Sequence, residues 1–386
     1  MNFYKFLKVS LGILLILSIP IITKAAVLYL LPQSQNVYKE DSFLVEVRLD
    51  SENEEINTAE VNLKIPSNLL EILDFSKGET ILTFWAKEPE LKDGILSLIG
   101  GIPGGFKGNG LILKITFLAK EIGKTEVNFR EDSKVLLNDG KGTPTKLNFL
   151  EGNYEVVEKP EGLPIISSRT HPDQNKWYKG NTLHLHWDLV EGAEYSFLLS
   201  KDPLAEPDEI PDKPEPREGL IWMGDMEYPN LEDGIYYFHL RERRGTDADL
   251  NAEPTRKWGP KVTFRAMIDS TGPEDFEPEI GKDPAVFEGK YFLSFATTDK
   301  TSGIDFFEVK EGKRNFKRAE SPYLLEDQEL KSIIKVKAVD KAGNEKISEI
   351  IPPEKPFPYW IVIVILIGMV TIIIVIWWII RRLRNK

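Results

Sequence analysis

The stretch SLIGGIPGGFKGNGLILKITF, from Ser97 to Phe117, sets a glycine-rich segment between two runs that have the pattern of β-strands. Apolar and polar residues alternate from Leu113 onward, and Ile95–Ile99 is a second run of strand-forming residues. A phosphate-binding loop needs a helix behind it and a Gly-Lys-Ser/Thr signature, and neither follows Gly110. We therefore predict that residues 100–110 form a structural connection between two strands and bind no nucleotide.

Strand patterns recur along the whole chain, bounded by Gly, Pro, Asn and Asp. Between the termini at most one turn of helix is expected, at Asn68–Asp74. The strands predicted in the first third are Ala26–Leu31, Ser42–Asp50, Thr58–Ile65, Ile81–Ala86, Ile95–Ile99, Gly110–Ala119, Thr125–Phe129, Lys134–Leu137 and Gly152–Val156. Short strands at this spacing, without helices, predict an all-β chain of three tandem β-sandwiches.

Proline-rich joints divide the chain into segments. The predicted organisation is a signal peptide (1–25), a first sandwich (26–158), a second (160–268), a third (269–353), a proline-rich stalk (354–358), a transmembrane helix (359–380) and a basic tail (381–386).

The N-terminal segment has the order of a secretory signal peptide. Lys5 and Lys8 precede an uncharged run from Val9 to Ile22, and small residues follow, so cleavage is expected after Ala25 or Ala26. The alternative is an uncleaved anchor, but an apolar core of 14 residues is short for a membrane span.

The C-terminal segment is predicted to cross a membrane once. Tyr359–Ile380 holds 22 uncharged residues, which as a helix cover about 33 Å, and aromatic residues stand at both ends. The basic residues 381–386 follow directly and predict a cytoplasmic C-terminus by the positive-inside rule. We expect a protein of the cell membrane with an extracellular ectodomain.

The segment between the leader and the tail is acidic, with 42 basic and 61 acidic residues and a net charge of −19. This charge argues against binding nucleic acid. The chain has no cysteine, so no disulfide supports the sandwiches despite the expected export.

The first sandwich resembles a cohesin domain over roughly residues 27–157. The resemblance lies in the order of Val37–Val47, Ile56–Pro66, Gly110–Ala119 and Val135–Thr143. It implies a jelly-roll-like sandwich, a fold that cohesins share with a group of carbohydrate-binding modules. It also implies a dockerin, a calcium-loaded helical module, as a partner on one sheet face. This chain has one such unit and no dockerin of its own, so a different ligand is also open.

The next two segments resemble modules that act mostly as spacers. His184–Trp187 and Gly234–Arg241 resemble a fibronectin type III-like module. Phe295–Val309 and Ile334–Glu345 resemble the bacterial Ig-like modules of surface proteins.

One loop has oxygen ligands at alternating positions, as at the start of a calcium loop. The loop departs from the helix–loop–helix calcium pattern at two positions, with Ala252 in place of glycine and Trp258 in place of glutamate. Two interpretations are therefore open, a structural calcium site closed by other carboxylates or a solvated acidic turn. No other cofactor is expected. The candidate ligands are Asp247, Asp249, Asn251 and Glu253.

Three histidines form a second, weaker candidate for a metal site. His184 and His186 share one face of a strand and could join His239 around an ion. The alternative is that all three are polar positions of a sandwich.

Catalytic motifs are missing from the sequence. It has no Gly-x-Ser-x-Gly, no His-Glu-x-x-His and no cysteine nucleophile, and acidic pairs carry little information among 61 carboxylates. We expect no enzyme.

Phe84 and Trp85 are the candidate ligand-binding residues. Strand alternation turns one of the two outward, where it could stack on a sugar or anchor a protein interface. The alternative is that both rings pack inside the sandwich.

These observations predict a non-enzymatic surface protein that recognises a dockerin-like protein module or an extracellular polysaccharide, with a link to polysaccharide breakdown as one reading. The alternative is a purely structural stalk. An exposed cluster of aromatic residues would favour a sugar, and a flat polar face with few apolar residues would favour a protein.

Overall fold

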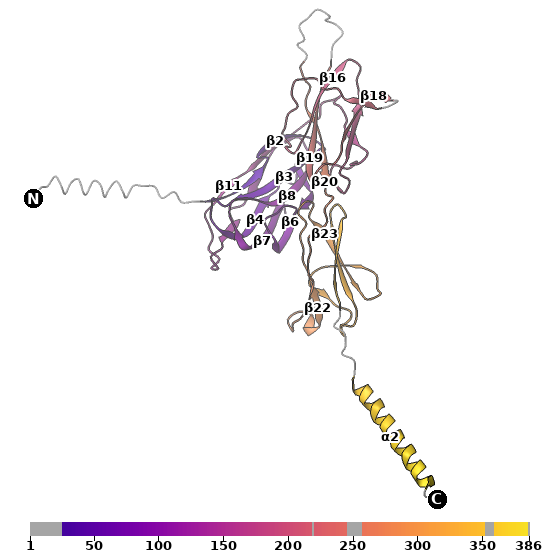
Figure 1. The fold of residues 1–386 in the computed structure, drawn as a ribbon. Helices are drawn as coiled ribbons and strands as arrows, with labels where there is room; N and C mark the ends of the chain where they lie inside the picture. The colour runs from indigo at the N-terminus through magenta and orange to yellow at the C-terminus, as the bar shows by residue number, and fades with distance from the viewer. Residues whose placement is uncertain (1–24, 218–219, 245–256, 352–358, 385–386) are drawn as a thin grey trace, which may run out of the picture.

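The computed structural model describes residues 25–217, 220–244, 257–351 and 359–384. The predicted signal peptide up to residue 24, the calcium candidates Asp247, Asp249, Asn251 and Glu253, and the stalk 354–358 lie outside these residues. Within them, the prediction of an all-β chain with one C-terminal apolar helix is confirmed (Figure 1).

The strands form three groups, which we call the first, second and third units, and each unit has its own cluster of buried apolar side chains. The domain boundaries given above stay a prediction. The first unit comprises β1 (Ala26–Leu31), β2 (Ser34–Tyr38), β3 (Ser42–Asp50), β4 (Ile56–Lys64), β5 (Leu70–Ser76), β6 (Phe84–Lys92), β7 (Ile95–Phe106), β8 (Asn109–Ala119), β9 (Gly123–Phe129), β10 (Lys134–Leu137), β11 (Leu147–Leu150) and β12 (Gly152–Val157).

Two sheets enclose the core of the first unit. Their strand orders are β11-β1-β3-β8-β5 and β2-β12-β9-β4-β7-β6, and β10 pairs with β4. The alternation in strand β3 explains how a sheet contributes one face to this core. The apolar residues Phe43, Val45, Val47 and Leu49 are buried, and the residues between them are half-exposed on the other face.

The second and third units are smaller. The second has two four-stranded sheets, β13-β15-β18-β17 and β14-β20-β19-β16. Its strands are β13 (Ser167–Ser168), β14 (Trp177–Tyr178), β15 (Leu183–Asp188), β16 (Ala193–Ser200), β17 (Glu215–Arg217), β18 (Leu220–Tyr228), β19 (Gly234–Arg244) and β20 (Val262–Ile268).

The third unit has sheets β21-β22-β25 and β24-β23-β26-β27, with the short 3-10 turn η1 (Phe287–Gly289) between β21 and β22. Its strands are β21 (Glu279–Lys282), β22 (Tyr291–Ser294), β23 (Ile304–Glu311), β24 (Lys317–Ala319), β25 (Tyr323–Leu324), β26 (Ile334–Asp340) and β27 (Glu345–Ile350).

The prediction of a loop over residues 100–110 was wrong. Strand β7 continues to Phe106, β8 begins at Asn109, and only Lys107 and Gly108 lie between them. The two strands belong to different sheets. The glycines sit instead where the register of β7 against β4 shifts, and Gly104 and Gly105 have φ of +88° and +82° there, a backbone conformation that glycine adopts without strain.

Two further predictions were wrong in the same region. Asn68–Asp74 was expected to form a helical turn, but β5 runs from Leu70 to Ser76 and pairs with β8. The strand expected at Ile81–Ala86 begins only at Phe84, where pairing with β7 starts. In both places the partner strand, rather than the local sequence, decides the structure.

Helix α2 (Tyr359–Arg384) ends the described chain. Its segment Val362–Arg384 contains an 18-residue window with a mean hydropathy of 3.1 and is long and apolar enough to cross a membrane.

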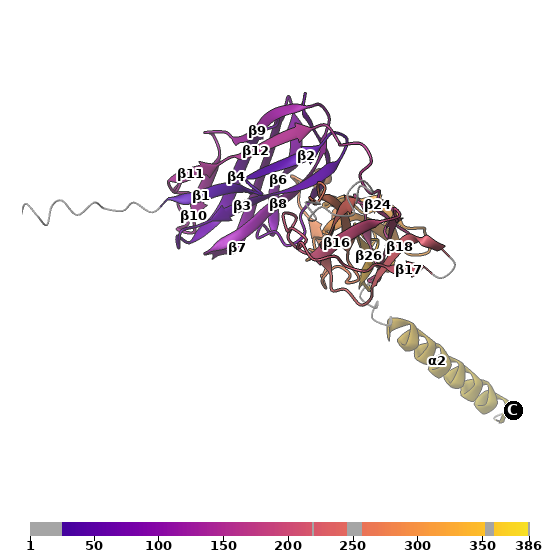
Figure 2. The same cartoon turned by 90° about the horizontal axis from the view of Figure 1, so that it is seen from above.

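The three units contact one another through hydrogen bonds, and Figure 2 shows the first unit beside the other two. Ser42 Oγ donates to Asn175 Oδ1 of the second unit at 2.8 Å. From the third unit, Lys341 Nζ donates to Asp74 Oδ1 at 2.6 Å, and Ser302 accepts a hydrogen bond from Ser76 Oγ at 3.0 Å. All three side chains of the first unit lie on β3 or β5, so the other units dock on the five-stranded sheet.

Candidate functional site

Phe84 and Trp85 lie side by side on β6 but point in opposite directions. The Phe84 side chain lies against Gly101 of β7 and leaves 61% of its surface exposed. Trp85 packs against the core of the first unit, with Lys77 Nζ 5.4 Å from its ring centroid. Of the two candidates, Phe84 is the exposed ring and Trp85 is half-buried.

Phe84 belongs to a larger surface on the seven-stranded sheet, which we call the outer sheet face. Between the buried core residues of β4 and β7 stand half-exposed side chains that alternate outward. The members of this face are Thr58, Glu60, Asn62, Phe84, Ser97 and Ile99. It is mostly polar, and Phe84 is its one exposed large aromatic group.

The five-stranded sheet is placed differently. Lys114 and Thr116 point away from the core on β8, yet they are only 4% and 6% exposed. Lys114 forms an ion pair with Glu79. Because the second and third units dock on the same sheet, the outer sheet face is the more open of the two.

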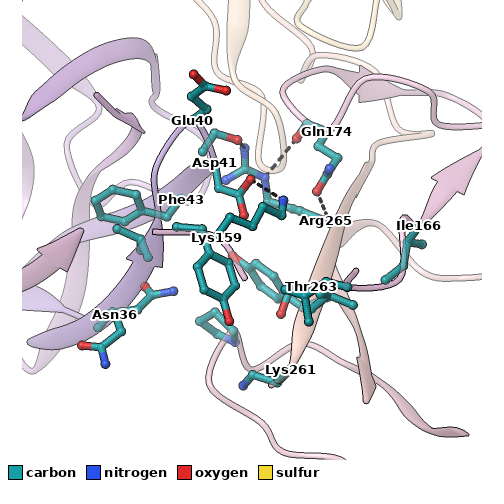
Figure 3. Close-up of a pocket in the computed structure, with 18 of the residues that line it drawn as sticks. Asn36, Glu40, Asp41, Phe43, Lys159, Ile166, Gln174, Lys261, Thr263 and Arg265 are labelled. Atoms are coloured by element: carbon teal, nitrogen blue, oxygen red, sulfur yellow. Dashed lines mark hydrogen bonds and ion pairs between the residues drawn. The ribbon is translucent and has the colours of Figure 1, made fainter. Parts of the chain in front are cut away.

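A cavity of about 1090 Å³ lies between the first and second units (Figure 3). Four segments contribute to its wall: strand β2, the first residues of β3, the linker after β12 and strand β20. Two ion pairs stand in its wall, one on each side: Lys159 Nζ to Asp41 Oδ1 at 2.9 Å beside the first unit, and Lys261 Nζ to Glu206 Oε1 at 2.9 Å in the second unit.

Arg265 of β20 is the buried cation of this wall, with 3% of its surface exposed. Its guanidinium donates to Gln174 O at 3.0 Å, Asn175 Oδ1 at 2.6 Å and Ser42 Oγ at 3.3 Å. All three acceptors are neutral, and among the described residues Nη1 has no hydrogen-bond partner. Burial lowers the pKa of Arg265.

The structure does not bring the three predicted histidines together. His184 and His186 lie on β15, in one sheet of the second unit, and His239 lies on β19 in the other. His186 Nε2 is 2.9 Å from Ser167 Oγ, and His239 is buried between Thr263 and Asp202. These are separate polar positions.

Three other carboxylates converge where the second unit meets the third. Asp269, Asp299 and Asp340 are at most 5% exposed and offer oxygens within 4.8 Å of one another. They accept hydrogen bonds from backbone N–H groups, Asp269 from Thr271 and Ser302. Burial, followed by repulsion from Asp299 and Asp340, raises the pKa of Asp269 to about 6. A carboxylate set of this kind has the chemistry to hold a divalent cation.

Sequence reasoning missed both Arg265 and this carboxylate cluster. Asp299 and Asp340 stand in segments that were interpreted only as spacer motifs, each followed by a glycine within four residues. The pairing of β23 with β26 places Ile304 opposite Asp340 and so brings the two loops together. The available signal in the sequence was a repeated Asp-Lys pair with a glycine three or four residues after the aspartate.

No protein-family model and no curated protein matches the chain. Among solved structures it is similar to a non-cellulosomal cohesin from Archaeoglobus fulgidus, at 14% identity over 36% of this chain and 95% of that one, with a TM-score of 0.31. It is also similar to the third ScaB cohesin of R. flavefaciens in complex with a group 1 dockerin, at 16% identity over 36% and 100%, with a TM-score of 0.29. Across 84% of this chain and 71% of the other, it is similar to the four N-terminal Ig domains of Dscam1 isoform 1.9, at 9% identity and a TM-score of 0.19.

Proposed function

We propose that this chain is a membrane-anchored recognition protein whose outer sheet face binds a folded protein module, with a dockerin-like module as the partner class. The observation that carries the proposal is the contrast between the two sheets of the first unit. One sheet is used for docking within the chain, and the other presents a free, mostly polar face with Phe84 on it.

The composition of the free face favours a protein partner over a sugar. Sugar-binding surfaces commonly offer aromatic rings for stacking, and here Trp85 is turned inward while Phe84 alone stays outside. Protein interfaces, in contrast, combine a few apolar anchors with a polar rim. Ion pairs such as Lys87 with Glu90 stand beside the face and could supply that rim.

The two ends of the chain are the basis for the proposed location at a membrane. A signal sequence would export the units, and α2 would hold them at the membrane with the basic tail inside. The second and third units would then act as spacers that carry the first unit.

Affinity capture with the full chain in lipid nanodiscs tests the proposal. The bait is exposed to an extract of the source cells, and bound proteins are compared between wild type, Phe84→Ser and the control Phe287→Ser. Phe287 is 38% exposed on the third unit, so the control removes a similar ring elsewhere.

A specific partner should bind to wild type and to Phe287→Ser and should be lost from Phe84→Ser. Loss of an anchor of about 2 kcal/mol weakens binding about 30-fold. A ligand that survives protease treatment of the extract, or that is insensitive to Phe84, would refute the proposal.

A further inference from the structure

The cavity between the first and second units is larger than a site for one small group requires. Its volume of about 1090 Å³ lies slightly above the usual range for ligand pockets, roughly 300–1,000 Å³. In Figure 3 its labelled residues come from both units, with Asp41, Lys159 and Arg265 near one another at the centre of the view. The wall therefore offers contacts to a ligand of several linked groups.

Strand β2 supplies unused hydrogen-bonding groups to this wall. Ser34, Gln35 and Asn36 are among the residues that line the cavity, and their side chains form no hydrogen bond with another residue in the part of the chain that the structure describes. A hydroxyl and two amides both donate and accept hydrogen bonds. This is the pattern that the hydroxyl groups of a saccharide match.

The charges of the wall leave one cation without a counter-ion. Asp41 is paired with Lys159 and Glu206 with Lys261. The remaining acids, Glu40 and Asp173, form no ion pair with Arg265 within 4.0 Å. The guanidinium of Arg265 is thus hydrogen-bonded only to neutral oxygens, carboxylates such as Asp173 and Asp74 act on it only from a distance, and its Nη1 has no hydrogen-bond partner among the described residues.

A buried charge of this kind acts strongly on its surroundings. With 3% of its surface exposed, Arg265 is poorly screened by water, and burying an unpaired charge is costly. An anionic group in the cavity would reduce that cost. Since the ectodomain as a whole is acidic, bulk charge would not supply this attraction, and the local cation has to do so.

We propose that this cavity binds an acidic saccharide, with its carboxylate drawn toward Arg265 and its hydroxyls bonded to the amides of β2. The site is independent of the proposed function, because β2 and β6 form opposite edges of the seven-stranded sheet. An acidic peptide is the competing ligand class, and the experiment below separates the two.

Isothermal titration of the full chain in nanodiscs tests the proposal with trigalacturonate as the probe. The trimethyl ester of the same trisaccharide keeps the rings and hydroxyls but removes the charges. The acid form should bind at least tenfold more tightly than the ester, and its affinity should fall as sodium chloride is raised. Equal affinity of acid and ester, or no binding of the acid at millimolar concentration, would overturn the proposal.

Three variants locate the interaction. Arg265→Gln should reduce the affinity for the acid to that for the ester. Asp41→Asn removes a wall carboxylate that is 43% exposed and frees Lys159, so it should bind the acid more tightly than wild type does. The control Arg314→Gln makes the same charge change on the third unit, where Arg314 is 50% exposed, and should bind like wild type.

The Asp41→Asn variant keeps the test decisive if Arg265→Gln does not fold. Unchanged affinity for the acid in Asp41→Asn would then overturn the assignment to this cavity, as would unchanged affinity in a folded Arg265→Gln. Tetraglutamate binding more tightly than trigalacturonate would overturn the saccharide class.

Discussion

Gly78 allows the close approach of the first and third units, and its replacement should separate them. A methyl group at this position would fall inside the carbonyl of Thr301 and close to the backbone of Gly303. Since these contacts are backbone atoms rather than a flexible side chain, Gly78→Ala forces the two loops apart. We expect the first unit to keep its fold, because the clash lies on its surface loop and not in its core.

Overpacking costs about 1–3 kcal/mol. If this cost falls on the docked state, the ratio of docked to undocked molecules drops about 5- to 150-fold. The contacts that depend on docking are the hydrogen bond from Ser76 to Ser302 and the ion pair from Lys341 to Asp74.

Hydrogen exchange followed by mass spectrometry on the full chain measures this change. Peptides that cover residues 74–79 and 299–304 should lose protection in Gly78→Ala, while peptides from β3 and β8 should stay protected. Gly180→Ala is the control, because no atom lies within 4 Å of the added methyl group and φ is not positive. Wild-type protection at both loops in Gly78→Ala would refute the reasoning, and so would loss of protection throughout the first unit.

Three further outcomes are expected. Burial raises the pKa of Asp269 to about 6, above the roughly 3.9 of an unfolded chain, so the folded state binds a proton more tightly and the contribution of Asp269 to stability is lost as pH rises through 6. Asp299 also raises this pKa, so the rise in melting temperature from pH 7.5 to pH 5, measured with a chelator present, should be smaller in Asp299→Asn than in wild type. An equal rise in both proteins would contradict this. Gly110→Val should destabilise the chain by about 1–3 kcal/mol through overpacking against Ile81 and Phe106, and ATP should not shift the wild-type melt; a saturable shift would show a nucleotide site. Protease added to intact cells should remove residues 26–351, and full protection would contradict the proposed topology.

The strands that could be predicted from the sequence are those whose own pattern is strong. The bounds of β1, β3 and β10 are those predicted from the local run of strand-forming residues, which in β3 also alternates. Strand β5 and the second half of β7 could not be found this way, because they depend on pairing with β8 and β4, which are distant in sequence. Local preference is weak there, and the partner decides.

The site was predictable in part for a similar reason. Alternation implies that Phe84 and Trp85 point to opposite sides, but only the packing of the sheets shows which one is outside. Arg265 could not be found, since alternation in β20 would place it in solvent. Arg265 is buried because the loop at Gln174 and the first residue of β3, Ser42, cover the outward face of β20.

The contact between Lys341 and Asp74 also determines how the three units would carry a load. A pull on the outer sheet face reaches α2 by two routes: along the covalent chain through the second unit, and across the ion pair directly into the third unit, from which the chain continues to the helix (Figure 1). The two routes act in parallel, so the second unit bears only part of the force while the contact holds. When the contact breaks, the full tension passes through the second unit, and the first unit gains reach without losing its covalent connection to α2.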